Sequence, residues 1–214
     1  MNWIGKAAWI AGLALLGTGP LAARAAPPAP ARSGAEQDAT ATVHYMLTLL
    51  NGQAMFRAAV SQATPSARAR PVVEEALRRM DMRVLSQANA PMVAAAVDAD
   101  TLRTCARFVQ APEQTALLGI MPDSSNPQAA LAAMPPAQRQ QVLDVLQTPC
   151  LMAVGDALNQ PGAQVVLITY ANQLLCDAWD ALPPEQQYDR GQAGLTCPAP
   201  ATGPGTATPA AQAR

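Results

Sequence analysis

The longest apolar segment of the chain, PGAQVVLITYANQLLCDAWDAL from Pro161 to Leu182, decides between an all-helical fold and one that contains a sheet. Its run VVLITY is rich in β-branched residues, which favour strands. Apolar residues also recur along the whole segment at helical intervals, in two stripes. The stripes are Leu167, Ala171, Leu174, Ala178 and Leu182, and Val165, Ile168, Leu175 and Trp179. Because a helix that is apolar on two faces usually lies at the centre of a bundle, we predict a long central helix near residues 162–182.

Helical spacing continues on the N-terminal side of this segment, in pieces separated by prolines. Val43, Met46, Leu47 and Leu50 lie at positions i, i+3, i+4 and i+7 of one helix face. A second helix is expected from Pro71 to about Gln87, and Asp98 or Asp100 is expected to cap a third. Ten prolines lie between Pro65 and Pro161, and each is expected to exclude helix interior around it, because proline lacks an N–H and clashes with the preceding turn. The prediction is an all-α, compact bundle of several short, proline-punctuated helices.

The first 25 residues have the pattern of a Sec-type signal peptide. Lys6 provides the positive charge, and Ala7–Leu16 is an apolar stretch too short for the ~20 residues that span a bilayer. Ala23-Arg24-Ala25 then matches a small-x-small cleavage site. We therefore expect a periplasmic or secreted bacterial protein, with an uncleaved N-terminal membrane anchor as the alternative.

Two further segments contain little that could pack into a core. Residues 26–37 and residues 198–214 are rich in Pro and Ala and poor in large apolar side chains. Burial could not offset the entropy lost when such segments become ordered, so we expect a disordered linker and a disordered tail. Between them, residues 38–197 have about the usual length of one domain.

Charge and composition exclude several classes of function. The chain has 14 basic and 15 acidic side chains and a formal net charge of −1, whereas a nucleic-acid-binding domain normally presents a basic face. After the signal segment there is no apolar run long enough for a membrane span. Lys6 is the only lysine and His44 the only histidine, so lysine chemistry after cleavage and a multi-histidine metal site are excluded. No cofactor is expected.

A weak internal repeat links two parts of the expected domain. Phe108–Pro112 (FVQAP) resembles Val145–Pro149 (VLQTP) at an offset of 37 residues, although chance in an Ala-, Pro- and Gln-rich chain remains an alternative. The stretch Phe108–Leu117, and less closely Ala157–Val166, also resembles the Phe-Tyr-x-Ser-Pro-x-Gly corner of an uncharacterised, all-helical family of bacterial periplasmic domains. Val109 stands where that family has Tyr. Over residues 98–175 the resemblance implies an envelope protein with no assigned reaction.

The four cysteines, Cys105, Cys150, Cys176 and Cys197, predict two disulfides, because an even number of cysteines in an exported chain usually pairs. Three pairings are possible. We favour Cys105–Cys150, which would join the two repeat copies, with Cys176–Cys197. The crossed pairing Cys105–Cys176 with Cys150–Cys197 remains open. A redox-active pair would need a low-pKa thiolate in an electropositive setting, and no Cys-x-x-Cys motif is present.

Catalytic groups are hard to find in this sequence. His44 is the only imidazole for a nucleophile–base pair, and no serine lies in a Gly-x-Ser-x-Gly motif. Two carboxylate pairs, Glu74 with Glu75 and Asp98 with Asp100, are better explained by helix salt bridges and capping. No catalytic, cofactor-binding or metal-binding residue is therefore assigned.

We predict an exported, non-enzymatic helical domain that binds a peptide or an apolar partner, an unknown protein or ligand of the cell envelope. One alternative is a hydrolase that uses Asp and Arg without His. It would require a pocket in which at least two of five side chains converge away from solvent: Asp98, Asp100, Arg103, Asp144 and Asp156. A second alternative is a carrier of a small ligand or lipid, which would require a dry cavity between helices.

Overall fold

The computed structural model describes residues 33–63, 70–122, 124, 126–187 and 197, and within them the chain forms ten α-helices and no strand. The predicted all-α fold is confirmed. The helices are α1 (Gly34–Leu49), α2 (Gly52–Ala63), α3 (Arg70–Arg79), α4 (Met82–Ala96), α5 (Ala99–Val109), α6 (Pro112–Thr115), α7 (Pro127–Ala133), α8 (Pro136–Leu146), α9 (Pro149–Leu158) and α10 (Pro161–Ala181), and a 3-10 turn follows at Pro184–Gln186. Residues 1–25 and 198–214, the expected signal and tail, lie outside the described residues.

Most of the helix starts follow the proline and capping signals. Five helices begin with proline in the first turn: α6, α7, α8, α9 and α10. Proline is tolerated there because an N–H in the first turn would form no hydrogen bond within the helix. Asp98 caps α5 as expected, by accepting a hydrogen bond from the Thr101 N–H. The first helix begins earlier than expected, at Gly34, because the side chain of Ser33 caps it by accepting from the Glu36 N–H. Residues 34–37, expected to belong to a linker, are therefore helical.

Two expectations about helix continuity were wrong. The single helix expected from Pro71 to about Gln87 is divided into α3 and α4, because Asp81 has extended backbone angles and caps α4 by accepting from the Arg83 N–H at 2.7 Å. Pro91, expected to exclude helix around it, lies inside α4. Its cost is one hydrogen bond to the Gln87 carbonyl, and α4 remains helical because it packs closely along α1.

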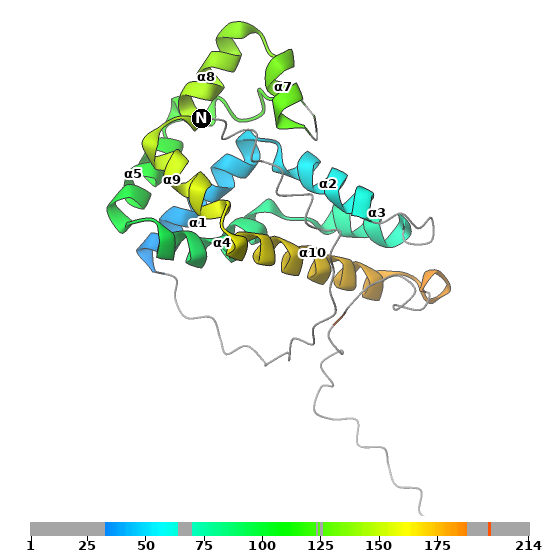
Figure 1. Cartoon of the computed structure of the whole chain (residues 1–214). Helices are drawn as coiled ribbons and strands as arrows, with labels where there is room; N and C mark the ends of the chain where they lie inside the picture. Colours follow the sequence, from blue (N-terminus) through cyan, green and yellow to red (C-terminus); the bar gives the residue numbers. More distant parts are fainter. Residues whose placement is uncertain (1–32, 64–69, 123, 125, 188–196, 198–214) are drawn as a thin grey trace, which may run out of the picture.

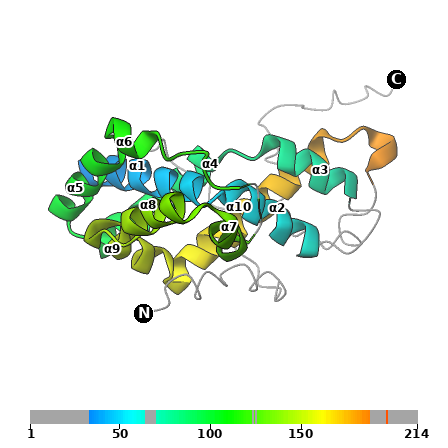
Figure 2. The ribbon, with the colours of Figure 1, turned by 90° about the horizontal axis from the view of Figure 1, so that it is seen from above.

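The buried apolar side chains form two clusters, which we call the main core and the smaller core. The main core is built by α1, α4, α5, α7, α8 and α9, and its fully buried side chains include Val43, Met46, Leu49, Leu102, Leu151 and Val154. The smaller core lies between α2, α3 and the C-terminal half of α10, and consists of Phe56, Val72, Val73, Ala76, Ala171, Leu174, Ala178, Trp179 and Leu182. Figures 1 and 2 show α2, α3 and the end of α10 on one side of the molecule, away from α5.

The longest helix, α10, has 21 residues and contacts α3, α4 and α9 (Figure 1). Its length and position agree with the prediction. The burial of its two stripes is uneven, because its N-terminal half places only a small residue, Ala163, fully against the neighbouring helices. On the second stripe Trp179 is buried, Ile168 is half-buried, and Val165 is 59% exposed. The helix therefore joins the two parts of the fold and is not enclosed along its whole length.

The chain contains two disulfides, in the pairing that the sequence favoured. Cys105 of α5 is bonded to Cys150 of α9, with the Cα atoms 5.5 Å apart, and Cys176 of α10 is bonded to Cys197, with the Cα atoms 5.6 Å apart. The crossed alternative is wrong. None of the helices in the described ranges is long and apolar enough to cross a membrane.

Candidate functional site

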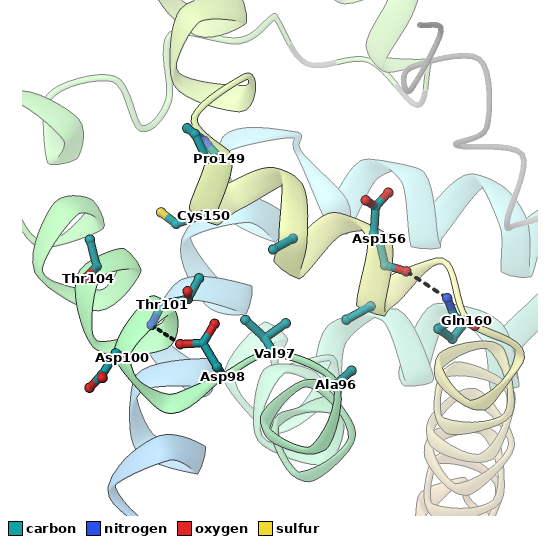
Figure 3. Close-up of a pocket in the computed structure, with 12 residues that line it drawn as sticks. Ala96, Val97, Asp98, Asp100, Thr101, Thr104, Pro149, Cys150, Asp156 and Gln160 are labelled. Carbon is teal, nitrogen blue, oxygen red and sulfur yellow. Dashed lines mark hydrogen bonds between the residues drawn. The ribbon is translucent and has the colours of Figure 1, made fainter.

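A hollow of about 760 Å³ lies between α5 and α9, beside the end of α4 (Figure 3). Three aspartates, two threonines, a glutamine, a half-buried cysteine and small apolar residues line it. They are Ala96, Val97, Asp98, Asp100, Thr101, Thr104, Pro149, Cys150, Ala153, Asp156, Ala157 and Gln160. No basic side chain is among these lining residues, so the hollow is acidic.

One wall of the hollow is the start of α5. Asp98 precedes the helix in extended conformation, and its Oδ1 accepts a hydrogen bond from the Thr101 N–H at 2.8 Å. Two hydrogen bonds from Thr101 lower the pKa of Asp98 below its ordinary value, and the one from the Thr101 side chain has the larger effect. Asp100 lies in the first turn and accepts from Arg103 Nη1 at 2.6 Å. Both carboxylates are exposed. Both stabilise the start of α5, because the free N–H groups there carry partial positive charge.

The opposite wall is α9, which begins with Pro149 immediately before Cys150. Asp156 lies on the exposed side of this helix, six residues beyond Cys150. Gln160 lies just beyond the helix, and its Nε2 donates to the backbone carbonyl of Asp156 at 3.5 Å (Figure 3). Because the Cys105–Cys150 disulfide joins α5 to α9, a covalent bond sets the separation of the two walls.

The hollow brings together three of the five side chains that a hydrolase was expected to use: Asp98, Asp100 and Asp156. Arg103 and Asp144 do not line it. All three carboxylates are exposed, whereas a desolvated convergence was required. A general acid at neutral pH needs a raised carboxyl pKa, but the pKa of Asp98 is lowered. The arrangement therefore does not support acid–base hydrolysis in this hollow.

The other candidate groups lie elsewhere. Glu75 forms ion pairs with Arg78 and, at 2.6 Å, with Arg79, and the hydrogen bond from Arg79 is the main reason why the pKa of Glu75 is lowered. His44 is half-buried on α1, and its Nδ1 has no hydrogen-bond partner among the described residues. Within the same described residues, no three His, Cys, Asp or Glu side chains are grouped to hold a metal ion.

The surroundings of the Cys105–Cys150 bond do not favour a redox-active pair. A low-pKa cysteine needs a positive environment, whereas Cys150 shares its hollow with three carboxylates. A dry carrier cavity is not supported by this hollow either, because the same carboxylates line it. Comparisons of the chain with protein-family models, with curated proteins and with solved structures find no match.

The sequence indicated Asp98 and Asp100 as a capping pair but did not place Asp156 beside them. Asp98 and Asp100 lie at the start of α5 and Asp156 lies on α9, and residues 110–148 separate these two helices in the chain. Only the predicted Cys105–Cys150 bond could have indicated that these helices are neighbours. Once that bond is drawn, α5 and α9 have to lie side by side.

Proposed function

We propose that this protein is an exported, non-enzymatic helical domain of the bacterial cell envelope, and that it binds a peptide with basic side chains in the hollow between α5 and α9. The observation that carries the proposal is the composition of the hollow, which is lined by three carboxylates and no cation. Asp100 is paired with Arg103, which lies outside the lining, so Asp98 and Asp156 contribute most of the negative charge. A surface of one charge selects partners of the opposite charge.

The small apolar side chains explain why a peptide is favoured over a free cation. Val97, Ala153 and Ala157 line the hollow between the carboxylates, and Val97 and Ala157 are themselves buried. A lysine or arginine side chain has a long apolar stem and a charged end. Its stem would lie along these residues while its charge reaches Asp98, Asp100 or Asp156. Exposed ion pairs contribute little individually and are screened by salt, so we expect weak, salt-sensitive binding.

Export is supported by the signal-like N-terminus and by two disulfides, which persist in oxidising compartments. Its test is fractionation of a bacterial host that expresses the full chain. Recovery in the periplasm, with a new N-terminus at Ala26, is expected. Intact protein in the cytosol with reduced cysteines would contradict export.

The binding proposal is tested with short fluorescein-labelled peptides in which Ala alternates with Lys, with Gln or with Glu. Fluorescence anisotropy should show binding of the Lys peptide, weaker binding of the Gln peptide and none of the Glu peptide. The variant Asp100→Asn/Asp156→Asn should bind the Lys peptide several-fold more weakly.

The matched control is Asp144→Asn/Asp177→Asn. Both of these carboxylates are exposed, neither lines the hollow, and each accepts a 2.7 Å hydrogen bond from a glutamine one turn earlier. The two double variants have the same net charge. Equal loss of binding in both would show a general charge effect, and the peptide site in the hollow would be rejected.

A further inference from the structure

The two cysteines of the Cys105–Cys150 disulfide differ in exposure, since Cys105 is buried and Cys150 borders the hollow. Cys105 is 0% exposed and belongs to the main core. Cys150 is half-buried and lines the hollow, where Figure 3 draws it beside Pro149. We infer that the hollow is the route by which small thiols reach this disulfide, that they attack only the sulfur of Cys150, and that thiols carrying positive charge are preferred.

The exchange begins when a thiolate sulfur attacks the sulfur of Cys150. A new S–S bond forms to Cys150, and the Cys105–Cys150 bond breaks. The electron pair of that bond leaves with Cys105, whose thiolate takes up a proton, because burial in the core favours the neutral thiol. There is no net oxidation or reduction, since one disulfide replaces another.

The product is a mixed disulfide on Cys150 and a free thiol on Cys105. The Cα atoms of the two residues lie 5.5 Å apart in the native fold, so the Cys105 thiol stays within reach of the mixed disulfide. It can expel the small thiol and re-form the original bond. The adduct is therefore expected to be transient and to require rapid acid quenching for detection.

The preference for cationic thiols follows from the carboxylates in the same hollow, Asp98 and Asp156 together with Asp100, whose charge is partly offset by its ion pair with Arg103. The thiolate of cysteamine has no net charge because its ammonium group offsets the sulfur. That of 2-mercaptoethanol carries one negative charge, and that of 3-mercaptopropionate carries two. Repulsion by the carboxylates should therefore make cysteamine the fastest of the three reagents and 3-mercaptopropionate the slowest. The leaving group cannot produce this order, because Cys105 is the leaving thiolate with every reagent.

The site of attack is tested on the unmodified protein with cysteamine. After acid quenching, free thiols are blocked with N-ethylmaleimide, and the chain is cut with trypsin and with a protease that cleaves before Asp. Cleavage after Arg103 and Arg107 then releases a peptide that contains only Cys105, and cleavage before Asp144 and Asp156 releases one that contains only Cys150. Mass spectrometry should find cysteamine on Cys150 and maleimide on Cys105. Cysteamine on Cys105, or on both residues equally, would overturn the inference.

The charge preference is tested by the exchange rates of the three thiols, each divided by its rate with a small neutral disulfide. The corrected rate should be several-fold higher for cysteamine than for 3-mercaptopropionate, and the ratio should approach one in ~1 M salt, where the Debye length is about 3 Å. It should also fall in Asp100→Asn/Asp156→Asn and stay unchanged in Asp144→Asn/Asp177→Asn. An unchanged ratio in the hollow variant would contradict the route through the hollow.

Thiol exchange at Cys150 does not depend on peptide binding, and no peptide is present when it is measured. Failure of the Lys peptide to bind would leave the exchange results intact. Conversely, attack at Cys105 would leave the binding result intact.

Discussion

The hydroxyl of Tyr170 forms hydrogen bonds to both backbone groups of Asp81. It accepts from the Asp81 N–H at 2.9 Å and donates to the Asp81 carbonyl at 3.0 Å. Asp81 separates α3 from α4, and Tyr170 lies on α10 with its ring centroid 5.9 Å from that of Phe56 on α2. One side chain therefore fixes the junction between α3 and α4 against the helix that joins the two cores.

Tyr170→Phe should destabilise the fold, because it removes both hydrogen bonds and keeps the ring against Phe56. The expected loss is about 1–2 kcal/mol of unfolding free energy, measured by urea denaturation and circular dichroism. Thr169→Ala, an exposed change on the same helix, is the control and should have little effect. Equal midpoints for wild type and Tyr170→Phe would mean that the two bonds do not stabilise the junction.

Tyr45 should make the protein unstable at alkaline pH. Its side chain is buried in the main core, its hydroxyl donates to the Gln114 carbonyl at 3.2 Å, and burial raises its pKa to about 12. The unfolded chain ionises this phenol near pH 10. Its contribution is therefore complete below about pH 10 and is lost as the pH rises towards 12. The urea midpoint should fall over this range.

The same titration of Tyr45→Phe identifies the source of that fall. Phe keeps the apolar ring and has no group that ionises, so its urea midpoint should decrease less between pH 10 and 12. A decrease as large as in the wild type would assign the alkaline effect to other groups.

The two disulfides should contribute unequal stability. Titration with Ellman's reagent should find no free thiol, since all four cysteines are paired. The bonds close loops of 45 and 21 residues, for which the chain-entropy model gives about 4 and about 3 kcal/mol. Denaturation of Cys105→Ala/Cys150→Ala and of Cys176→Ala/Cys197→Ala measures the two losses. A larger loss in the second variant would contradict this order.

Gly52 and Gly162 should respond differently to alanine. A Cβ at Gly52 would lie 2.9 Å from the backbone carbonyl oxygen of Leu47. Gly52 directly follows Asn51, whose φ is already positive at 53°, so the turn has little freedom to adjust. Gly52→Ala should therefore cost about 1–3 kcal/mol.

The matched change Gly162→Ala would place its Cβ 3.2 Å from the sulfur of Met92, a flexible side chain that can move. We expect no loss, and up to about 1 kcal/mol of gain from helix propensity. The readout for both variants is the thermal midpoint. A stable Gly52→Ala protein would show that the turn between α1 and α2 has room to adjust.

Trp179→Ala should loosen the smaller core before the main core. Trp179 is 4% exposed among side chains of α2, α3 and α10, and its truncation should cost about 3–5 kcal/mol. Hydrogen exchange followed by mass spectrometry should show faster exchange in residues 70–79 and 171–181 than in α1 or α5. Uniform acceleration in all helices would show that the two cores unfold as one unit.

Local signals in the sequence were enough for the helices and for much of their punctuation. Helical spacing in residues 161–182 outweighed the β-branched run, because spacing of three and four residues places apolar side chains on one helix face. The starts at Pro112, Pro149 and Pro161 and the cap at Asp98 depend on groups within one turn of the chain. The favoured disulfide pairing came from the expectation that two repeat copies are joined.

Long-range packing decided everything else. Pro91 is tolerated because α4 packs along α1. The backbone groups of Asp81, where α3 and α4 are separated, are hydrogen-bonded by Tyr170, 89 residues away. Whether Val165 is exposed, and whether Asp156 meets Asp98, depends on how distant helices cross. Those crossings are set by the combined burial of many side chains from separate parts of the chain, whereas a pattern within one helix reports only which face is apolar.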